Sequence, residues 1–364
     1  MYFIRTCGID GVRVLEVAKA KFTDAEFEFV DMDMNKWGTY VFGVRVISFY
    51  EMLRKFEDGD KVVIPARYLG REILDELQIG KISGNLLLVC DGENIISLEK
   101  FYYLEYLEYH TNDHCNLNCR GCSHFCPLVK EEIFTDYELF ERDIYRLKEL
   151  IPYIKQIRIM GGEPFLNPQL GKFVSITRNK YKESDIRIVT NGILVENLSD
   201  ELWEIIKENN VKIDISAYPA LIKRIDYIVD EILKHGVKVG LIRNVSYFNQ
   251  IMHEKRELPF DNTSNCICNN IHDGHIASCP MAFYGKYFNE YFHTNIPFES
   301  GQIDLFKIKS GKELMEKLNT PFAFCNYCNE HNVGINLSLN KKKWISQNGV
   351  TNFKISDWCE AGKI

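Results

Sequence analysis

The sequence predicts an α/β protein whose central part is an open, partial barrel of the (β/α)6 type, and three observations predict it. Residues 104–255 alternate short apolar runs with amphipathic segments in five clear strand–helix steps, with room for a sixth. Residues 1–103 alternate in the same way on a smaller scale, whereas residues 256–364 lose the alternation and gain cysteines. Such alternation is typical of layers with parallel strands. We therefore expect three parts, with boundaries after residues 103 and 255.

Composition and charge narrow the class of protein. The chain has 364 residues, 46% of them hydrophobic, which is enough for more than one core. The net charge of −7 argues against a nucleic-acid-binding surface. We see no apolar run of membrane-spanning length and no signal pattern at the N-terminus, so we expect a cytoplasmic protein that binds no membrane. Twelve cysteines in that compartment point to metal or catalytic chemistry rather than to disulfides.

The first part, residues 1–103, is predicted to be a small parallel α/β layer. Its apolar runs are VRVIS (44–48), KVVIPA (61–66) and LLLVC (86–90), and a helical pattern follows each of the first two. The layer resembles the Rossmann-like fragments of proteins that modify sugar nucleotides, but it has no G-x-G-x-x-G loop. A scaffold or docking layer fits equally well, and a leader-peptide-binding domain of the winged-helix type fits less well.

The second part, residues 104–255, supplies the barrel. The expected strands are 106–112, 156–160, 186–192, 212–219 and 237–242. The expected helices are 136–150, 170–180, 199–209 and 221–236. In barrels of the TIM type the chemistry lies at the C-terminal ends of the strands. The polar groups at those ends should therefore meet at one mouth, although more than a hundred positions separate some of them.

The most informative motif is the run HCNLNCRGCSH, which places Cys115, Cys119 and Cys122 at C-x3-C-x2-C spacing. A cubane iron–sulfur cluster normally takes four cysteines, so three leave one iron without a protein ligand. The alternative is a zinc knuckle, which His114 and Cys126 lie close enough in sequence to complete.

A second motif, Gly161-Gly162-Glu163-Pro164, follows an apolar run one helix and one strand later. The two motifs in this order resemble the signature of radical S-adenosylmethionine (SAM) enzymes. The resemblance implies that the open iron chelates SAM and that the second motif contacts the amino group of SAM. It also implies reductive cleavage of SAM to methionine and a 5′-deoxyadenosyl radical, which abstracts hydrogen from a substrate. The two glycines would let the backbone approach the ligand closely.

Other strand ends supply further candidates. Asn191 and Ser216 are candidates for the ribose hydroxyls of SAM, and Asp214 faces the same side of its strand as Ser216. Asp214 either takes part in catalysis or is a charge satisfied at the barrel rim. Many relatives have an aromatic residue directly before the third cysteine, where this chain has Gly121. We therefore expect another group, Phe125, to pack on adenine; its alternative role is loop packing.

The third part, residues 256–364, carries a second cysteine pattern. Gly274-x4-Cys279 and the later Cys325-x2-Cys328 resemble the auxiliary-cluster extension called SPASM or its shorter form, Twitch. The resemblance implies a second [4Fe–4S] cluster. Its expected ligands are Cys268, Cys279, Cys325 and Cys328, with Cys266 as the alternative first ligand. A structural zinc site of four cysteines also fits this spacing.

The auxiliary cluster and two spare thiols bear on the reaction type. A fully ligated second cluster would transfer electrons, which suits a two-electron oxidation. A thiol near the substrate could instead return a hydrogen atom and so produce epimerisation. Cys126 and Cys359 are the spare thiols, and for each the alternative is a small buried hydrophobic residue.

We therefore expect a radical SAM oxidoreductase or epimerase that acts on a carbohydrate, cyclitol or nucleotide sugar. It would need an electron donor such as flavodoxin or ferredoxin. One alternative is a peptide-modifying radical SAM enzyme that matures ribosomal peptides. The other is a zinc-stabilised binding protein without catalytic activity.

Overall fold

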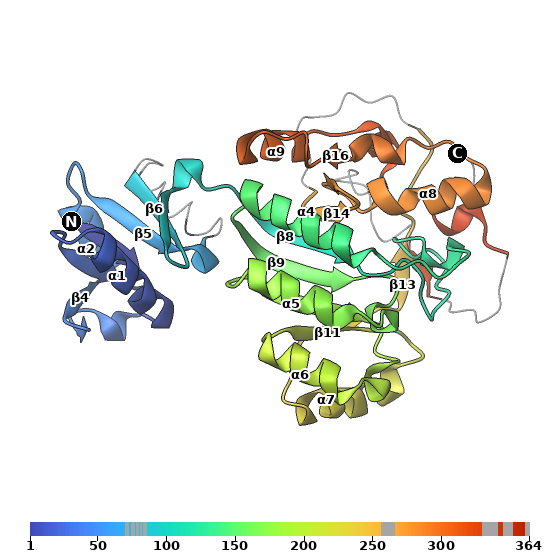
Figure 1. Cartoon of the computed structure of the whole chain (residues 1–364), viewed down its shortest axis with the longest axis horizontal. Coiled ribbons are helices and arrows are strands. Elements are labelled where there is room, and N and C mark those ends of the chain that lie inside the picture. The colour runs from blue at the N-terminus through green and yellow to red at the C-terminus, as the bar shows by residue number, and fades with distance from the viewer. Residues whose placement is uncertain are drawn as a thin grey trace. The chain divides into compact units, whose positions relative to one another are not determined.

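The protein is seen here as a computed structural model (Figure 1). The described residues are 1–69, 73, 77, 80, 82, 86–255, 266–329, 341–344 and 352–360. The chain divides into two compact units. The first unit comprises Met1–Glu105, Ile151–Lys155 and Tyr181–Ser184, and the second Tyr106–Leu150, Gln156–Lys180 and Asp185–Ile364. The expected division into three parts stays a prediction, because both the barrel and the cysteine-rich part fall within the second unit.

The first unit is built on a seven-stranded sheet in the order β3-β4-β2-β1-β5-β6-β7. Its elements are β1 (Tyr2–Arg5), α1 (Ile9–Lys21), β2 (Phe27–Val30), β3 (Tyr40–Val41), β4 (Val44–Ile47), α2 (Phe49–Lys55), β5 (Lys61–Pro65), β6 (Leu87–Asp91) and β7 (Asn94–Ser97). The strands β4, β2, β1, β5 and β6 are parallel, and the two edge strands are antiparallel. Numbered along the chain, the parallel strands lie in the order 3-2-1-4-5. That is the order of a doubly wound Rossmann-type sheet, whose strand order reverses between β1 and β5.

Helices α1 and α2 pack on opposite faces of the sheet of this unit. Ile4 and Val63 share a core with α1, whereas Phe3 and Val62 share a core with α2. Neighbouring residues of one strand thus point to opposite sides, as the period of two requires. The predicted α/β layer is confirmed.

The turn from β1 into α1 has a spacing that we did not recognise in the sequence. Thr6, Gly8 and Gly11 stand at the three positions of a G-x-G-x-x-G loop, with threonine in the first. Thr6 has a φ of 82°, a value that glycine normally provides. A Cβ on Gly11 would lie 2.0 Å from the carbonyl oxygen of Thr6, so the third position requires glycine. The loop therefore keeps the Rossmann-type geometry with one substitution.

Asp31, directly after β2, holds this turn through its carboxylate. The backbone N–H of Cys7 donates to Oδ2 at 3.0 Å, and the N–H of Asp33 donates to Oδ1 at 3.0 Å. Burial alone would raise the pKa of Asp31, but these hydrogen bonds outweigh it and lower the pKa to about 2. The ionised carboxylate is thus favoured by folding.

We expect Asp31→Asn to remove an acid-sensitive part of the stability. Because the folded-state pKa lies below the ordinary value of 3.8, the contribution is complete above pH ~4 and is lost as the pH falls towards 2. Its size is about 2 kcal/mol. Urea unfolding between pH 5 and pH 2 should show a shallower loss of stability in this variant. The exposed Asp24→Asn in the same unit is the control, and equal slopes for Asp31→Asn and wild type would contradict the role of Asp31.

The second unit contains an eight-stranded sheet in the order β12-β11-β10-β9-β8-β14-β15-β16. Its strands are β8 (Tyr103–His110), β9 (Tyr153–Met160), β10 (Asp185–Thr190), β11 (Lys212–Ala217), β12 (Lys238–Asn244), β14 (Asn270–His272), β15 (His275–Ala277) and β16 (Ile303–Asp304). Its helices are α4 (Tyr137–Leu150), α5 (Leu170–Lys180), α6 (Asp200–Glu208), α7 (Ile225–Lys234), α8 (Met281–Phe292) and α9 (Gly311–Leu318). The five strands predicted for the barrel are all present, and the mixed α/β class with parallel strands is confirmed.

The sixth barrel strand is not found among the described residues. The chain after β12 instead forms β13 (Tyr247–Asn249), which pairs antiparallel with β17 (Lys341–Lys343). The sheet grows on the other side of β8, where β14 pairs in parallel through Asn270 and Glu108. The cysteine-rich part therefore extends the sheet directly.

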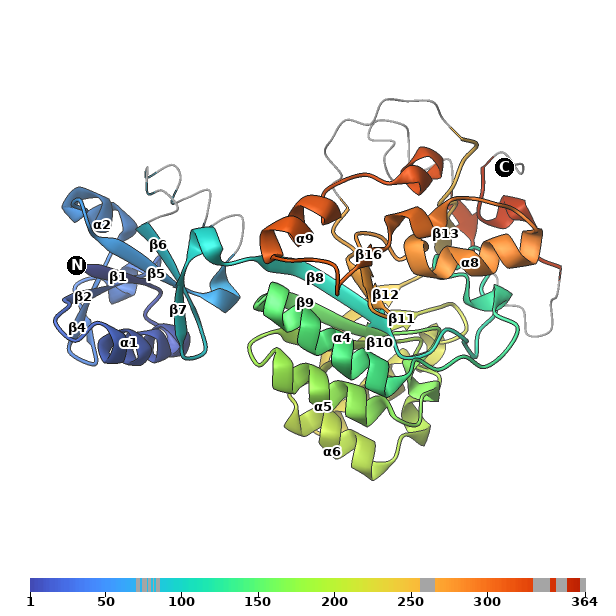
Figure 2. The same ribbon diagram turned by 45° about the horizontal axis from the view of Figure 1, so that its top comes forward.

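The two faces of the five parallel strands differ in chemistry. Ile215 lies near Ile228 of α7 around Gly192, and Tyr109 packs on Phe140 of α4. These contacts identify the face that the helices cover (Figure 2). The residues between them point to the opposite face by the strand period of two. That face carries polar and charged side chains, namely Tyr106, Glu108, His110, Arg158, Arg187, Asp214 and Ser216.

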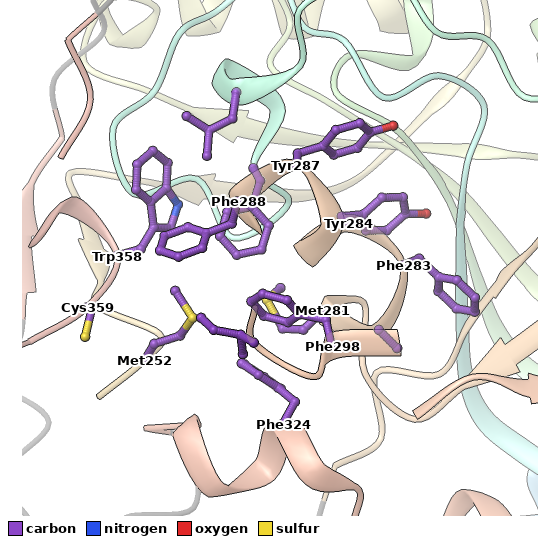
Figure 3. Close-up of a cluster of buried hydrophobic side chains, with 14 of the residues drawn as sticks. Met252, Met281, Phe283, Tyr284, Tyr287, Phe288, Phe298, Phe324, Trp358 and Cys359 are labelled. Atoms are coloured by element: carbon purple, nitrogen blue, oxygen red, sulfur yellow. The ribbon is translucent and has the colours of Figure 1, made fainter. Parts of the chain in front are cut away.

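An aromatic cluster joins the loop after β8 to the cysteine-rich part (Figure 3). Its largest fully buried members are Trp358, Tyr284, Phe125, Phe288, Phe298 and Phe324. Aromatic side chains bury large apolar areas, so this cluster fixes the loop on α8 and on the C-terminal residues. Across the described residues, none of the helices combines the length and the apolar character that crossing a membrane requires.

Candidate cluster-binding site

The cysteine loop, residues 114–126, follows the C-terminal end of β8 and brings four thiols together. The pKa of the Tyr218 phenol is raised, chiefly by burial. The next largest causes are the nearby sulfurs of Cys119, Cys122, Cys115 and Cys126. Tyr218 directly follows β11, so the loop of one strand meets the end of another. The three cysteines of the C-x3-C-x2-C motif thus lie at the mouth where the strand ends meet.

Each of the three motif sulfurs has a hydrogen-bond donor. The backbone N–H of Leu117 donates to Cys115 Sγ at 3.4 Å, and the amide of Asn191 approaches the same sulfur at 3.8 Å. The indole N–H of Trp344 donates to Cys119 Sγ at 3.2 Å. A hydrogen bond from the Cys126 thiol lowers the pKa of Cys122. Donors of this kind favour thiolates, the form in which cysteine binds metal.

The donor set is compatible with an iron–sulfur cluster. Burial raises the pKa of Cys119 to about 12 and raises that of Cys115 further, so a bound metal is needed to keep these sulfurs deprotonated. In the part of the chain that the structure describes, no three of its His, Cys, Asp and Glu residues are arranged to hold one metal ion. A cubane spreads its ligand sulfurs over a larger volume than a tetrahedral zinc ion does.

The second motif, after β9, lies against the start of the cysteine loop. The N–H of Gly162 donates to the carbonyl of Asn112 at 2.8 Å, and that of Glu163 donates to the carbonyl of His114 at 3.2 Å. A Cβ on Gly161 would lie 2.5 Å from the Asn112 carbonyl oxygen, and a Cβ on Gly162 would lie 2.0 Å from that of His114. The two glycines are therefore required by contact between the two motifs. Pro164 begins a short 3-10 helix, Pro164–Leu166, that follows directly.

The Glu163 side chain is fully buried and links the ends of β9 and β10. Its carboxylate accepts hydrogen bonds from the Thr190 hydroxyl and the Asn191 N–H, both at 2.8 Å, and from the Phe165 N–H at 3.2 Å. Burial raises the pKa of Glu163 to about 7, although these donors act to lower it. Because its oxygens are engaged, we propose that the amino-group contact expected of this motif comes from its backbone.

Asn191 and Ser216 lie at neighbouring strand ends. The Asn191 amide donates to Asn116 Oδ1 at 2.7 Å, which brings this residue against the cysteine loop. Ser216 is half-buried and lies opposite Arg243 of β12. Their contacts with the SAM ribose stay predictions, and the position of Asn191 beside Cys115 is compatible with such a contact.

Asp214 is buried, and its carboxylate is taken up by protein groups. It pairs with Arg187 at 3.2 Å and with Arg158 at 3.6 Å, and it accepts the N–H of Leu241 at 2.8 Å. These partners come from β9, β10 and β12. We therefore assign to Asp214 a role in holding the polar face of the sheet together rather than a contact with the substrate.

Two of the residues predicted for the mouth lie instead in the aromatic cluster. Phe125 has no exposed surface and packs on Phe288, with ring centroids 5.5 Å apart, and on Trp358 at 6.0 Å. The prediction that Phe125 packs on adenine is therefore wrong, because a side chain enclosed on all sides cannot reach a ligand. Cys359 is equally buried in this cluster, which contradicts the prediction of a thiol facing the substrate. Cys126 differs, since its thiol contacts Cys122.

Gly121 explains why no aromatic residue precedes the third cysteine. Its φ of 76° is left-handed, and a Cβ here would lie 3.0 Å from the carbonyl oxygen of Asp357 and 3.3 Å from Cβ of Phe248. A large side chain has no room at this position. The aromatic groups nearby are Tyr218 and Trp344, which stack with ring centroids 5.5 Å apart. Tyr218 could have been found from its place two residues after Ser216, whereas nothing in the local sequence pointed to Trp344.

The C-terminal cysteines come together only in part. The pKa of Cys279 is raised, chiefly by burial. The nearby sulfurs of Cys328, Cys266 and Cys268 raise it further. Burial raises the pKa of Cys325, and its Sγ accepts the Phe322 N–H at 3.5 Å. The structure thus groups Cys279 and Cys328 with both candidates for the first ligand. The four-cysteine auxiliary set stays a prediction.

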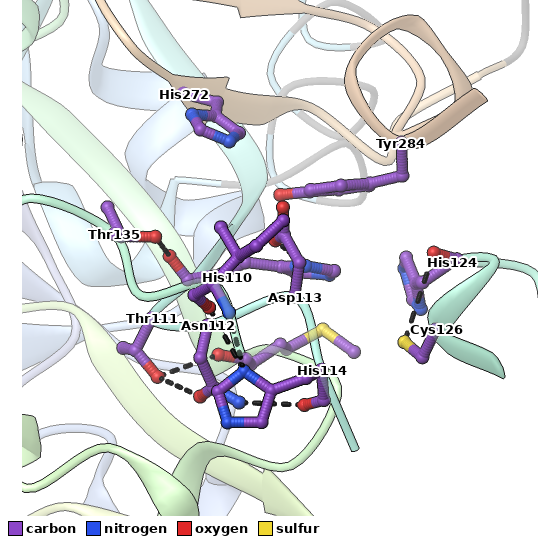
Figure 4. Close-up of polar contacts among 12 residues, drawn as sticks. His110, Thr111, Asn112, Asp113, His114, His124, Cys126, Thr135, His272 and Tyr284 are labelled. Carbon is purple, nitrogen blue, oxygen red and sulfur yellow. Dashed lines mark hydrogen bonds and ion pairs between the residues drawn. The ribbon is translucent and has the colours of Figure 1, made fainter. Parts of the chain in front are cut away.

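A buried polar network beside β8 was not predicted (Figure 4). The His110 ring stacks on Tyr284 at 3.7 Å, and its Nδ1 lies 3.1 Å from a carboxylate oxygen of Asp113. Glu108 lies 3.6 Å from His124 Nε2 and accepts the Asn270 amide at 3.2 Å. Burial lowers the pKa of His110 to about 4, so this ring is neutral. The network links the cysteine loop to β14 and α8.

A family comparison agrees with this arrangement. The model of the radical SAM superfamily matches residues 109–234, which run from β8 to the end of α7. Residues 109–234 form a radical SAM domain. Radical SAM domains use a [4Fe–4S] cluster and SAM, and the residues of the cysteine loop fit that cluster.

Curated relatives of this protein include a GTP 3′,8-cyclase of Clostridium acetobutylicum. The two are 28% identical over 262 residues, which cover 62% of this chain and 77% of the relative. A GTP 3′,8-cyclase of Sulfurimonas denitrificans is 30% identical over 115 residues. That match covers 30% of this chain and 35% of the relative, so it spans little more than the domain core.

Solved structures of radical SAM proteins resemble the chain, but their TM-scores to it are low. BtrN in complex with AdoMet and 2-DOIA has a TM-score of 0.35 and 18% identity, covering 62% of this chain and 93% of its own. Streptococcus suis SuiB bound to S-adenosylmethionine has a TM-score of 0.31 and 14% identity, covering 67% of this chain and 71% of its own. Scores this low carry no argument about the substrate of this protein.

Proposed function

We propose that this radical SAM enzyme abstracts hydrogen from a carbohydrate, cyclitol or nucleotide sugar, with oxidation or epimerisation as the outcome. Cys115, Cys119 and Cys122 would hold the cluster. When bound, the cluster supplies the electron that cleaves SAM to methionine and a 5′-deoxyadenosyl radical. The residues around the loop orient SAM and exclude water. The electron would come from a donor such as flavodoxin or ferredoxin.

The observation that carries the substrate class is the polar face of the parallel sheet. Arg158 lies over the ring of Tyr106 at 5.4 Å, and its Nε is buried without a hydrogen-bond partner among the described residues. Arg187 and Asp214 continue this row across the neighbouring strands. An apolar ligand would leave the buried Nε of Arg158 without a partner, whereas a hydroxyl or phosphate oxygen could accept its hydrogen bond.

The first unit supports a nucleotide-linked substrate. Its strand order is that of folds that bind nucleotides, and its Thr6-x-Gly8-x-x-Gly11 loop has the spacing of their phosphate-binding loop with threonine in place of the first glycine. The relatives named GTP 3′,8-cyclase act, by their name, on a nucleotide. Both observations favour a nucleotide sugar over a free cyclitol.

Two groups of cysteines bear on the outcome. An auxiliary [4Fe–4S] cluster on Cys268, Cys279, Cys325 and Cys328, with Cys266 as the alternative first ligand, would accept an electron in an oxidation. Cys126 is the remaining candidate for returning a hydrogen atom in an epimerisation. Because its thiol contacts Cys122 rather than an open surface, we favour oxidation.

The test is an anaerobic assay of 5′-deoxyadenosine formation. Reconstituted protein with SAM and dithionite is supplied in turn with nucleotide sugars, cyclitols, free sugars and synthetic peptides. We expect a nucleotide sugar to raise the yield of 5′-deoxyadenosine at least several-fold, with a product two mass units lighter for oxidation or of equal mass for epimerisation. If only a peptide raises the yield, the proposed substrate class is wrong and the substrate is a peptide. If the protein binds stoichiometric zinc and no iron, the proposal that it is a radical SAM enzyme is wrong.

A further inference from the structure

Two indole N–H groups from the C-terminal part of the chain reach the cysteine loop. Trp344 Nε1 donates to the sulfur of Cys119 at 3.2 Å, and Trp358 Nε1 donates to the backbone carbonyl of Cys122 at 2.8 Å. The two donors are chemically alike, but one acts on a cluster-ligand sulfur and the other on a peptide oxygen.

Neighbouring elements hold Trp344 in this position. It directly follows β17, and its backbone N–H donates to the carbonyl of Ser246 at 2.8 Å. Its ring stacks on Tyr218 with an interplanar angle of 25°. The indole therefore approaches Cys119 from a fixed direction, held by the short β13–β17 sheet and by the residue that follows β11.

The environment of Cys119 makes this hydrogen bond effective. The side chain is only 5% exposed, so little water competes for its sulfur. Reduction of a cluster adds negative charge to its thiolate ligands, and a donor aimed at a ligand stabilises that added charge. Hydrogen bonds to cluster sulfurs are among the factors that set the reduction potential.

We propose that Trp344 is a positioning residue that raises the reduction potential of the SAM-cleaving cluster by hydrogen bonding to Cys119. The inference rests on the proposed function, because it requires the cluster on the cysteine loop. It also assigns a task to the pair of strands β13 and β17. The β13–β17 sheet places the Trp344 indole beside Cys119. It thereby raises the reduction potential of the SAM-cleaving cluster.

Trp344→Phe and Trp358→Phe form a matched pair of variants. We expect Trp344→Phe to lower the reduced-to-oxidised ratio of this cluster about tenfold at a fixed potential, a shift of about 59 mV to more negative values. Trp358→Phe keeps the donor at Cys119 and should titrate like the wild type. The readout is an EPR-monitored redox titration of the holoenzyme without SAM, with the auxiliary cysteines mutated so that one cluster is observed.

A second measurement starts from the wild type with both tryptophans, and its wild-type result does not depend on how the variants fold. Pulsed EPR of the reduced cluster, in protein labelled with indole-15N tryptophan, should show a 15N coupling that persists in Trp358→Phe and disappears in Trp344→Phe. An unshifted potential in Trp344→Phe, or no 15N coupling in the labelled wild type, overturns the inference and leaves the proposed function standing. A wild type that binds no iron on the cysteine loop overturns the proposed function instead.

Discussion

We expect the replacement of Cys115, Cys119 and Cys122 together by alanine to abolish SAM cleavage and to leave the protein folded. The three thiols are the ligands of the proposed cluster, and the loop that carries them is fixed by other contacts. Trp358 donates to the Cys122 backbone, and Phe125 lies within the aromatic cluster. Neither contact requires a cysteine sulfur.

The measurement combines product and metal analysis. 5′-Deoxyadenosine should fall to the level of a reaction without enzyme, and iron should fall from roughly eight to roughly four atoms per chain if the auxiliary site holds a second cubane. Cys90→Ala, which removes a buried thiol of the first unit, is the control and should keep full turnover. Remaining SAM cleavage in the triple variant would show that the cluster lies elsewhere.

Gly162→Ala should prevent the cysteine loop from closing on the end of β9. The new Cβ would lie 2.0 Å from the His114 carbonyl oxygen and 2.8 Å from the backbone nitrogen of Cys115. The first atom belongs to the residue directly before the first ligand and the second to that ligand itself, so neither can move without displacing the loop. We expect a loss of about 3 kcal/mol in the free energy of unfolding, since overpacking against backbone is at the upper end of such costs.

Iron content after reconstitution and urea unfolding measure these two effects of Gly162→Ala. The cysteine-loop cluster should be largely missing, and the denaturation midpoint should fall. Gly8→Ala is the matched control, because its nearest neighbour, Thr6 Oγ1, lies 3.7 Å from the new Cβ. It should change stability by less than about 1 kcal/mol. Normal iron content in Gly162→Ala would mean that the second motif does not support the loop.

The parts of the site that could be predicted are those whose residues lie close together in the sequence. The three cysteines stand within one loop, and the two glycines directly follow a strand with Ile157 and Ile159 on its apolar side. The spacing of such motifs is a local property, and strand periodicity then places them at one end of the sheet. The five barrel strands were predictable for the same reason.

The parts that could not be predicted depend on contacts between distant segments. From its place in the sequence, Phe125 was expected at the mouth of the barrel. Its backbone is left-handed, however, and its ring is enclosed by aromatic rings that include those of α8. Trp344 reaches Cys119 across 225 positions, through a strand pair that no periodic pattern indicates. The loop of the first unit was missed because Thr6 takes a conformation that sequence patterns assign to glycine.

The central claim is that three cysteines hold a cubane and leave one iron open to SAM. The most direct test is the EPR spectrum of the anaerobically reduced protein, with Cys279 and Cys328 replaced so that only the cysteine-loop cluster contributes. The account predicts that added SAM changes the g-values of this cluster. S-adenosylhomocysteine in equal amount, which is not a sulfonium, should not be cleaved as SAM is. A spectrum that stays the same after SAM addition would contradict an open iron at this site.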